Sequence, residues 1–413
     1  MSVTSIKGFA DMFPPESDAF TFMEAKAREV FGRCGFVELR TPIVEHTELF
    51  CRSIGEETDV VQKEMYTFPD RKGRMLTLRP EATAGVMRAY IQSARHTQEP
   101  VSKLFTTGPM FRYERPQKGR MRQFHQINCE CLGSSSPYTD AELIVALMTF
   151  LQEIGLRDLS LKMNSLGCPS CRAAYKKALI AYLEGLDTEL LCDDCKRRMH
   201  TNPLRVLDCK QEGCKSLTAA APTILDYNCP DCRQHFDVVL RMLDAAKVPV
   251  TLDSCLVRGL DYYCRTTFEV VSGAIGAQSS VAGGGRYDGL IKQLGGADIP
   301  GVGFACGMER LALLLPQREA LRPDFFVVAM GQGTQDAAFG LVNSLRRQGF
   351  AGDMSHAGGS FKSQMRQADK SRARFCLIIG EEELAQGKVS VKNMLAEGKE
   401  QHSVPMAGVA ELF

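Results

Sequence analysis

The sequence lacks an excess of charge of either sign and lacks any long apolar run. Lys and Arg total 50 and Asp and Glu total 49, which excludes a surface made basic throughout for nucleic-acid binding but allows a local basic patch. No apolar run approaches the roughly 18–20 residues of a membrane span, and residues 1–11 lack the charged start and apolar stretch of a secretory signal. We therefore expect a cytoplasmic protein that does not bind membranes.

Two common nucleotide-binding motifs are also absent. The P-loop pattern does not occur, and the glycine-rich stretches do not form a dinucleotide-binding fingerprint. There are no internal repeats and no low-complexity tracts. The composition, 44% hydrophobic and 24% charged, is that of a folded globular protein, and 413 residues exceed what one hydrophobic core usually serves. Two or three domains are expected.

Cysteine, in contrast, is abundant, with 16 residues. Because the cytosol keeps thiols reduced, clustered cysteines there indicate metal before disulfides. Half of them form four pairs, three with C-x-x-C spacing: Cys168/Cys171, Cys192/Cys195, Cys209/Cys214 and Cys229/Cys232. Four thiolates complete a structural zinc site and leave no open position for a substrate. Eight ligands suit two zinc ions in a nested pairing, the middle pairs together and the outer pairs together, although one zinc ion or none stays open.

Strand and helix patterns on either side of the cysteine-rich segment predict an α+β domain. A helix is expected between Pro15 and Gly35, because apolar residues recur there at helical spacing. Strands are expected at 37–39, 74–78, 104–113, 122–132, 264–272 and 302–306, and helices at 141–153 and 308–315. Mostly antiparallel strands with few helices are typical of an α+β fold.

The last part of the chain has a different pattern. Apolar strands are expected at 325–330, near 354 and at 376–379, alternating with helices at 336–348 and 360–370. Continuous apolar strands separated by helices predict a small, mainly parallel α/β domain. The expected boundaries are 1–166 with 249–316 for the main domain, 167–248 for the cysteine-rich insertion and 323–413 for the last domain, after a linker at 316–323.

Two polar stretches of the first half could carry chemistry. In the stretch 78–83, Glu81 beside Thr83 could bind an ammonium group, or could simply be a carboxylate favoured at a helix N-terminus. In the stretch 111–124, Arg112 lies on an expected strand and could bind phosphate rigidly, while the loop cations after it could reach a nucleic-acid backbone. The alternative for that loop is a solvated hairpin tip.

Two further stretches lie after the insertion. The stretch 256–263 sets Arg258 among apolar residues and tyrosines, as in a polar site within a core or a structural ion pair. The glycines of 283–288 and 301–310 let a backbone approach a ligand closely, and Arg310 at a helix start could face a phosphate. Glycine content alone is weak evidence for a ligand site.

Together these stretches resemble the class II aminoacyl-tRNA synthetases and, within them, the histidyl-tRNA synthetases, over nearly the whole chain. Residues 31–45, 111–126 and 301–310 resemble the three motifs of the class. Residues 7–11 resemble the N-terminal signature of the histidine-specific family, and 256–263 followed by 283–288 resembles its own motif. Four ordered motifs are far more specific than any one of them.

The resemblance implies an antiparallel-sheet catalytic domain, interrupted by the insertion and followed by an α/β anticodon-binding domain. It implies a ligase that activates histidine with ATP to histidyl-adenylate and pyrophosphate, then transfers histidine to the 3′-terminal ribose of its tRNA. Mg²⁺ would arrive with ATP. The implied partners are histidine, ATP, the histidine tRNA and a second copy of the chain in a homodimer.

The resemblance also assigns roles to single residues. Arg112 and Arg258 would be catalytic at the α-phosphate, and ATP would also contact Glu114 at its adenine end and Arg310 at its far end. The implied histidine-binding residues are Glu81, Thr83, Gln126, Glu130, Arg258, Tyr262 and Tyr263. Within that set, Glu81, Thr83 and Gln126 would hold the α-amino group, and Glu130 and Tyr263 the imidazole. Gln117 and Arg120 would meet the acceptor end of the tRNA.

Two other functions remain to be weighed. A regulatory paralogue without aminoacylation activity typically lacks the arginine at position 258 and the anticodon-binding domain, and this chain has both features. A zinc-stabilised nucleic-acid-binding protein would need a basic insertion, yet acidic residues surround the cysteines and would repel phosphate. These are Asp193, Asp194, Asp208, Glu212, Asp226 and Asp231.

Overall fold

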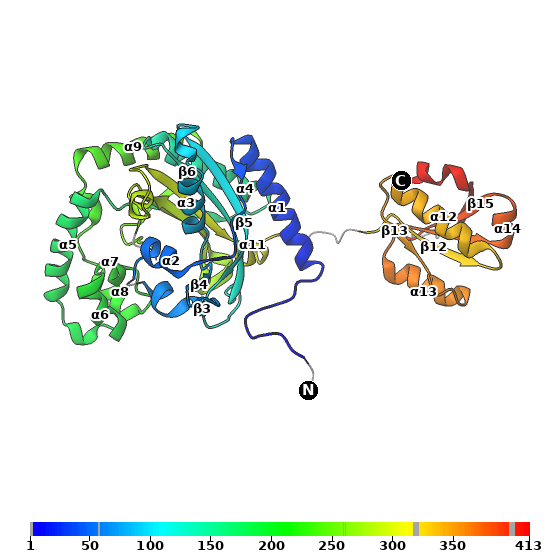
Figure 1. Cartoon of the computed structure of the whole chain (residues 1–413), viewed down its shortest axis with the longest axis horizontal. Coiled ribbons are helices and arrows are strands. Elements are labelled where there is room, and N and C mark those ends of the chain that lie inside the picture. The colour runs from blue at the N-terminus through cyan, green and yellow to red at the C-terminus, as the bar shows by residue number, and fades with distance from the viewer. Residues whose placement is uncertain (1–2, 57, 259, 261, 317–321, 396–400) are drawn as a thin grey trace. The chain divides into compact units, whose positions relative to one another are not determined.

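The computed structural model describes residues 3–56, 58–258, 260, 262–316, 322–395 and 401–413. The chain divides near residue 317 into two compact units, and each is described by itself (Figure 1). Most of the linker expected at 316–323 lies outside the described residues, as do Gly259 and Asp261 of the stretch 256–263. Among the described residues, no helix is both long and apolar enough to cross a bilayer.

An eight-stranded sheet forms the centre of the first unit. In spatial order its strands are β1 (Val37–Glu38), β5 (Ser102–Phe111), β6 (Gln123–Leu132), β11 (Gly301–Gly307), β10 (Ser280–Arg286), β9 (Cys264–Ser272), β7 (Leu159–Ser165) and β8 (Val250–Leu252). Every neighbouring pair is antiparallel except β1 with β5 and β7 with β8, at the two edges. The predicted α+β fold is confirmed.

Helices cover one face of this sheet, and the other face carries a pocket and part of a second hydrophobic core. The covering helices are α1 (Glu16–Arg33), α4 (Pro137–Glu153), α9 (Pro230–Ala245) and α11 (Met308–Ala312). Phe31 of α1 lies at the centre of their core, with ring centroids 5.2 Å from Phe150 and 5.8 Å from Phe304. Fully burying such side chains contributes roughly 1.5–3 kcal/mol each.

The glycine-rich stretch at 283–285 lies within a strand, β10, which pairs with β9 between Ser280 and Arg286 and with β11 between Ala282 and Arg286. Glycine is depleted in strands, so the sequence pattern placed these residues between strands and not in one. The strand forms because both neighbours supply hydrogen-bond partners, which are distant in sequence.

Residues 44–78 of the first unit also form a small three-stranded sheet. It contains β2 (Val44–His46), β4 (Met75–Leu78) and β3 (Tyr66–Pro69), with β4 in the middle. The helices α2 (Thr47–Ile54) and α3 (Thr83–Gln92) follow β2 and β4. This connection brings Glu81 and Thr83 to the N-terminus of α3.

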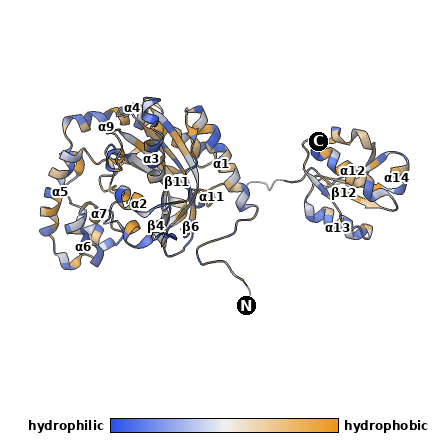
Figure 2. Ribbon diagram, viewed as in Figure 1, coloured by the Kyte–Doolittle hydropathy of each residue, from blue (hydrophilic) through white to orange (hydrophobic). Residues whose placement is uncertain are grey.

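The cysteine-rich insertion is helical and leaves the sheet between β7 and β8. Its main helices are α5 (Pro169–Glu184), α6 (Asp193–Thr201), α7 (Leu204–Leu207), α8 (Glu212–Thr218) and α9. Figure 1 shows α5 to α8 in green beside the sheet, and Figure 2 shows hydrophilic and hydrophobic residues alternating along α5 and α6. Because β8 pairs in parallel with β7, Leu161 opposite Val250, the insertion is the crossover connection between these two strands.

The second unit has a five-stranded sheet of order β13 (Gly352–Met354), β12 (Phe325–Met330), β14 (Phe375–Gly380), β15 (Lys388–Asn393) and β16 (Gln401–Pro405). The helices α12 (Thr334–Arg347), α13 (Phe361–Ser371) and α14 (Glu381–Ala385) connect or flank these strands. β13, β12 and β14 are parallel, but β15 and β16 are antiparallel. The prediction of a mainly parallel sheet is therefore wrong, because β15 and β16 are too polar to stand out as strands.

Candidate active site and cysteine clusters

A polar pocket lies on the sheet face opposite the helical core, and strand β6 shows why. Successive side chains of a strand point to opposite faces. Ile127, Cys129 and Cys131 face the core, whereas Gln126, Asn128 and Glu130 line the pocket. One strand thus contributes to both the stability of the unit and its site.

The pocket is lined by all but one of the residues that the resemblance assigned to histidine, ATP or tRNA binding. These are Glu81, Thr83, Arg112, Glu114, Arg120, Gln126, Glu130, Arg258, Tyr262, Tyr263 and Arg310. Gln117 is not in the lining and lies in the loop between β5 and β6, where its backbone N–H donates to the Arg120 carbonyl at 2.9 Å. The lining residues come from the start of α3, the loop between β5 and β6, β6, β10, β11, α11 and the stretch 256–263, and these segments meet only in the tertiary structure.

Three carboxyl and hydroxyl groups form the inner end of the pocket. The Glu81 carboxylate accepts hydrogen bonds from the N–H groups of Thr83 at 2.7 Å and Ala84 at 2.8 Å, at the start of α3. The Thr83 hydroxyl donates to Glu130 Oε1 at 2.7 Å. These bonds fix both carboxyl groups in place with little exposure to water.

Glu130 is the most perturbed carboxyl of the pocket. It is 1% exposed, and burial raises its pKa from 4.5 to about 8, against the opposing effect of hydrogen bonds from Tyr287 and Thr83. In the free protein Glu130 is therefore largely protonated at neutral pH. Burial raises the pKa of Glu81 as well, although its backbone hydrogen bonds oppose the rise.

Three arginines line the opposite part of the pocket. Arg112 Nε donates to the Pro80 carbonyl at 2.8 Å, and Arg310 donates to the carbonyls of Ser280 at 2.7 Å and Gly119 at 3.2 Å. Burial and the neighbouring Arg120 and Arg112 lower the pKa of Arg310, and burial lowers that of Arg112. Buried cations that repel one another form a ready site for a polyanion such as a nucleotide polyphosphate.

Arg258 completes the cationic wall from the stretch 256–263. Its guanidinium forms an ion pair with Glu269 at 3.2 Å and lies 5.8 Å from the centre of the Tyr263 ring. A Cβ built on Gly283 of β10 would lie 2.5 Å from Arg258 Nη1, so only glycine leaves room for this guanidinium against the sheet. The glycine-rich strand thus leaves the space that the Arg258 guanidinium occupies.

Sequence reasoning missed two residues of this region and left a third without a role. Tyr287 lines the pocket and donates a hydrogen bond to Glu130, and Glu309 accepts from the His125 N–H at 2.9 Å at the pocket rim. Arg286 instead turns away from the pocket into a fully buried ion pair with Asp140. The motif around 283–288 was the only sequence signal for Tyr287. It did not show that Tyr287 would face the pocket while the adjacent Arg286 would face away from it.

The eight paired cysteines form two clusters, each with its four sulfur atoms within 4.8 Å of one another. The base cluster contains Cys168, Cys171, Cys229 and Cys232, and the inner cluster contains Cys192, Cys195, Cys209 and Cys214. This is the nested pairing predicted from the sequence. All sixteen cysteines of the chain are free thiols, as the donor set of a metal site requires.

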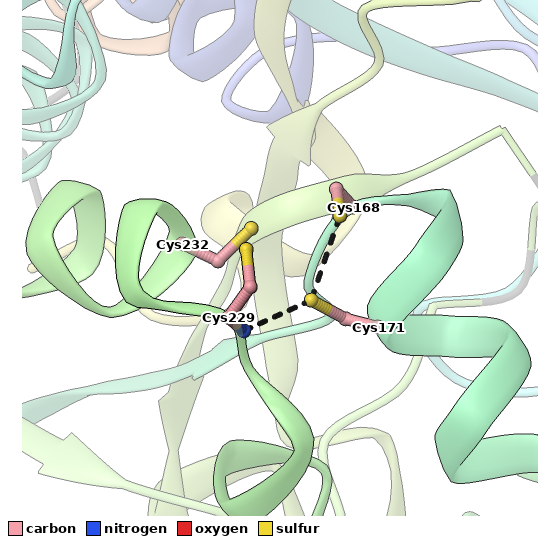
Figure 3. Close-up of side chains that lie close together, drawn as sticks. All are labelled: Cys168, Cys171, Cys229 and Cys232. Atoms are coloured by element: carbon pink, nitrogen blue, oxygen red, sulfur yellow. Dashed lines mark hydrogen bonds between the residues drawn. The ribbon is translucent and has the colours of Figure 1, made fainter.

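In the base cluster the four sulfur atoms lie close together, and one of them accepts a backbone hydrogen bond (Figure 3). The sulfurs of Cys168 and Cys171 are 3.5 Å apart, and the Cys229 N–H donates to Cys171 Sγ at 3.1 Å. Burial opposes ionisation, but hydrogen bonds from Cys171 and Ser170 lower the pKa of Cys168 to about 7, whereas burial raises the pKa of Cys171 and of Cys232. In the inner cluster, the Cys192 N–H donates to Cys214 Sγ at 3.3 Å. Thiolates are the form that binds metal.

The antiparallel sheet and its pocket, with buried arginines opposite buried carboxyl groups, define a class II aminoacyl-tRNA synthetase. Residues 8–311 match the family described as Histidyl-tRNA synthetase, and residues 324–413 match the Anticodon binding domain. A protein of Nitratidesulfovibrio vulgaris (strain DP4) named histidine--tRNA ligase is 68% identical over 99% of this chain and 97% of its own. A protein of Oleidesulfovibrio alaskensis with the same name is 64% identical over 98% of each. The crystal structure of apo S. aureus histidyl-tRNA synthetase has a TM-score of 0.83 at 34% identity and covers 100% of both chains.

The chain belongs to the histidyl-tRNA synthetase family. It is an ATP-dependent ligase that activates histidine to histidyl-adenylate with release of pyrophosphate and then transfers histidine to the 3′-terminal ribose of its tRNA. Its second unit is an anticodon-binding domain. The regulatory paralogue and the nucleic-acid-binding protein without activity, weighed from the sequence, are both rejected.

Proposed function

We propose that the arginine wall of the pocket binds ATP and stabilises the charge that develops during adenylate formation. Arg112 and Arg258 contact the α-phosphate, Arg310 binds the far end of the polyphosphate, and Glu114 lies at the adenine end. The observation that carries this assignment is that Arg112, Arg120, Arg258 and Arg310 line one pocket, where burial and the neighbouring Arg120 and Arg112 lower the pKa of Arg310 and a bound anion would relieve the repulsion. Mg²⁺ reaches the site with the ATP phosphates.

Histidine occupies the part of the pocket that Glu81 and Glu130 line. Its α-amino group is held by Glu81, Thr83 and Gln126, and Gln126 supports this role because its Oε1 is buried without a hydrogen-bond partner in the structure. An ammonium group supplies that missing donor. The α-carboxylate then extends toward Arg258 and the ATP site.

The imidazole contacts Glu130 and Tyr263, with Tyr262 in the same wall. The rings of Tyr262 and Tyr263 lie 4.6 Å apart, and Tyr262 lies 5.6 Å from Tyr287, so the tyrosines support one another. A site that is built to hydrogen-bond both ring nitrogens rejects amino acids that lack them by large factors, because its buried polar groups are then left unpaired.

The chemistry requires placement and charge stabilisation and no protein nucleophile. A histidine carboxylate oxygen attacks the α-phosphorus, a new oxygen–phosphorus bond forms, and the bond to pyrophosphate breaks. In the second step a hydroxyl of the terminal ribose attacks the acyl carbon and AMP leaves. Donors placed where charge develops contribute roughly 3–4 kcal/mol each, and this is the role of Arg258 and Arg112.

For tRNA binding we propose Gln117 and Arg120 at the acceptor end and the anticodon-binding domain at the other. The loop between β5 and β6 carries both residues beside the pocket. Arg120 forms an ion pair with Glu114 in the structure, so its guanidinium lies where the ATP and acceptor sites meet. The pair would exchange partners when tRNA arrives.

We further propose that each cysteine cluster holds one structural zinc ion. Four mutually close sulfurs with backbone N–H donors suit tetrahedral Zn²⁺, and they leave no open position for catalysis. On this basis the insertion is its own module at 167–248, between catalytic segments 1–166 and 249–316, and the anticodon-binding domain spans 323–413.

The enzyme is proposed to work as a homodimer in the cytoplasm. Apolar side chains that are between 39% and 48% exposed surround β1 and the small sheet: Val37, Ile43, Val44, Phe68 and Met75. Burying them against a second copy would stabilise both chains. Sedimentation equilibrium checks the mass, and a monomer at micromolar concentration would count against the dimer.

ATP–pyrophosphate exchange with each of the twenty amino acids tests the site as a whole. Exchange with histidine alone, lost in Arg112→Ala and Arg258→Ala, supports the assigned roles. Retention of full exchange by both variants would show that the pocket residues have other roles. Zinc quantification on protein purified without chelator tests the clusters separately, with two equivalents expected per chain.

A further inference from the structure

The base cluster lies directly behind the residues that face histidine, and three hydrogen bonds join the two regions. The Arg172 guanidinium donates to the Tyr263 carbonyl at 2.8 Å. The Arg265 N–H donates to the Gly167 carbonyl at 2.9 Å, and the Leu166 N–H donates to the Arg265 carbonyl at 2.7 Å. The stretch 166–172, which contains the first two ligands of the cluster, thus holds the backbone of 263–265.

That backbone needs to be held. Arg265 has φ +48°, a left-handed conformation that is unfavourable for a residue with a branched or long side chain. The same point is an irregularity in the sheet, because the register between β9 and β10 shifts after Gly285. Tyr263, which lines the pocket, directly precedes this irregular segment, so its ring position depends on contacts made outside the sheet ladder.

The base cluster and the stretch 166–172 are so tightly packed that a shift of the cysteines also shifts the backbone of Gly167. Gly167 has φ +62°, and a Cβ there would lie 2.5 Å from Cys171 Cβ and 2.6 Å from Asn228 Oδ1. The backbone of Gly167 therefore rests against both halves of the cluster at once. A change in the separation of Cys171 and Cys229 cannot leave Gly167 and its bond to Arg265 unaffected.

The two halves of the base cluster share one local sequence, Cys-Pro-x-Cys-Arg, at 168–172 and 229–233. Each begins a helix, with the first cysteine as N-cap and proline at the first helical position. The arginines differ in their targets, however. Arg172 reaches Tyr263 in the catalytic unit, whereas Arg233 donates to the Asp226 carbonyl at 3.2 Å, within the insertion itself.

The inner cluster has different surroundings. Cys195, Cys209 and Cys214 are buried in a hydrophobic core that contains residues of the insertion, such as Leu179 and Val206, and also Val257 and Tyr263 of the catalytic segments. None of the hydrogen bonds described for its four cysteines reaches the stretch 256–265.

We propose that the base cluster is a positioning site for histidine recognition, in which bound zinc fixes Cys168–Arg172 and through Arg172 the backbone of Tyr263. The inner cluster makes no such hydrogen bond among the described residues, and its part is to stabilise the insertion and the hydrophobic core that it shares with the catalytic segments. This inference rests on the proposed zinc sites and on the proposed contact of Tyr263 with the imidazole. Arg172 is thus a positioning residue that does not touch the substrate.

Histidine-dependent ATP–pyrophosphate exchange on the full-length enzyme tests this proposal, with Arg172→Ala, the matched control Arg233→Ala, and zinc quantification of every sample. Arg172→Ala is expected to keep two zinc ions and to raise the KM for histidine about tenfold, which corresponds to about 1.4 kcal/mol. The KM for ATP should change less than twofold. Arg233→Ala should match the wild type, and Arg172→Lys, which keeps one donor, should recover part of the loss.

Two cysteine variants separate the clusters. Cys229→Ser should lose one zinc ion and raise the KM for histidine as Arg172→Ala does, whereas Cys209→Ser should lose one zinc ion and keep that KM within twofold. If Cys229→Ser does not fold, the arginine variants still decide. An Arg172→Ala enzyme with an unchanged KM for histidine and two zinc ions overturns the proposal and leaves the zinc sites standing. A wild-type enzyme that exchanges with histidine but contains no zinc overturns the zinc sites themselves.

Discussion

Glu130→Gln is expected to change how the stability of the first unit depends on pH. Burial raises the pKa of Glu130 from 4.5 to about 8, so between these values the folded protein keeps a proton that the unfolded chain has released. Stability therefore falls as pH rises from about 4.5 to 8, by up to about 1.36 kcal/mol for each pH unit. The full difference corresponds to about 5 kcal/mol, an upper value because the protein can relax around the charge.

Glutamine removes the titration and keeps the hydrogen bonds. The hydroxyls of Thr83 and Tyr287, which donate to the carboxyl group, can each either donate to or accept from an amide. The free energy of unfolding of the variant minus that of the wild type should thus increase steadily from pH 5 to pH 8 and level off above. All other titrating groups are common to both proteins and cancel in the difference.

Urea denaturation followed by tyrosine fluorescence measures this difference for one unit alone. The chain has no tryptophan, and all ten tyrosines lie between Tyr66 and Tyr287, in the first unit. A difference that stays constant between pH 5 and pH 8.5 would refute the reasoning, because it would show that Glu130 has no raised pKa in the folded protein. Glu114→Gln, which replaces another carboxyl group of the same pocket, is the matched control for effects that do not come from Glu130.

Three further predictions follow from the geometry. Arg258→Ala should lower the single-turnover rate of adenylate formation by hundreds-fold, the loss of about 3–4 kcal/mol of charge stabilisation, and a fall below tenfold would contradict its role. Gly283→Ala should lower histidine-dependent exchange at least tenfold, because the new methyl group displaces the Arg258 guanidinium; unchanged exchange would mean that the guanidinium has room to move. Asp140→Asn should destabilise the first unit by about 3–5 kcal/mol in urea, because Arg286 is left as a buried charge with a weakened partner. Asp288→Asn, which removes the half-buried partner of the same arginine, should cost about 1 kcal/mol or less, and equal losses would refute the distinction.

Much of the fold could be predicted from local patterns. The strands β9 and β12 have strong apolar patterns, and the structure places them at the predicted residues, 264–272 and 325–330. The elements that local sequence predicts poorly are strands whose hydrogen-bond partners are distant in sequence. β10 contains three consecutive glycines, and β15 and β16 are polar, so only the neighbouring strands supply the hydrogen bonds that make them strands.

The sequence by itself determined which chemical groups this protein has: the arginines, carboxyl groups and tyrosines of the pocket, and the C-x-x-C pairs whose spacing suits a tetrahedral metal. Tertiary structure alone decided which of these groups meet. Adjacent residues of β10 and the turn after it separate, because Arg286 turns to Asp140 while Tyr287 turns to Glu130. Likewise, two segments with the same pattern, Cys-Pro-x-Cys-Arg, have arginines that donate to different partners, Arg172 to Tyr263 and Arg233 to Asp226. A strand's alternation and a helix's direction place a side chain, but its partner comes from a distant part of the chain, which local sequence does not specify.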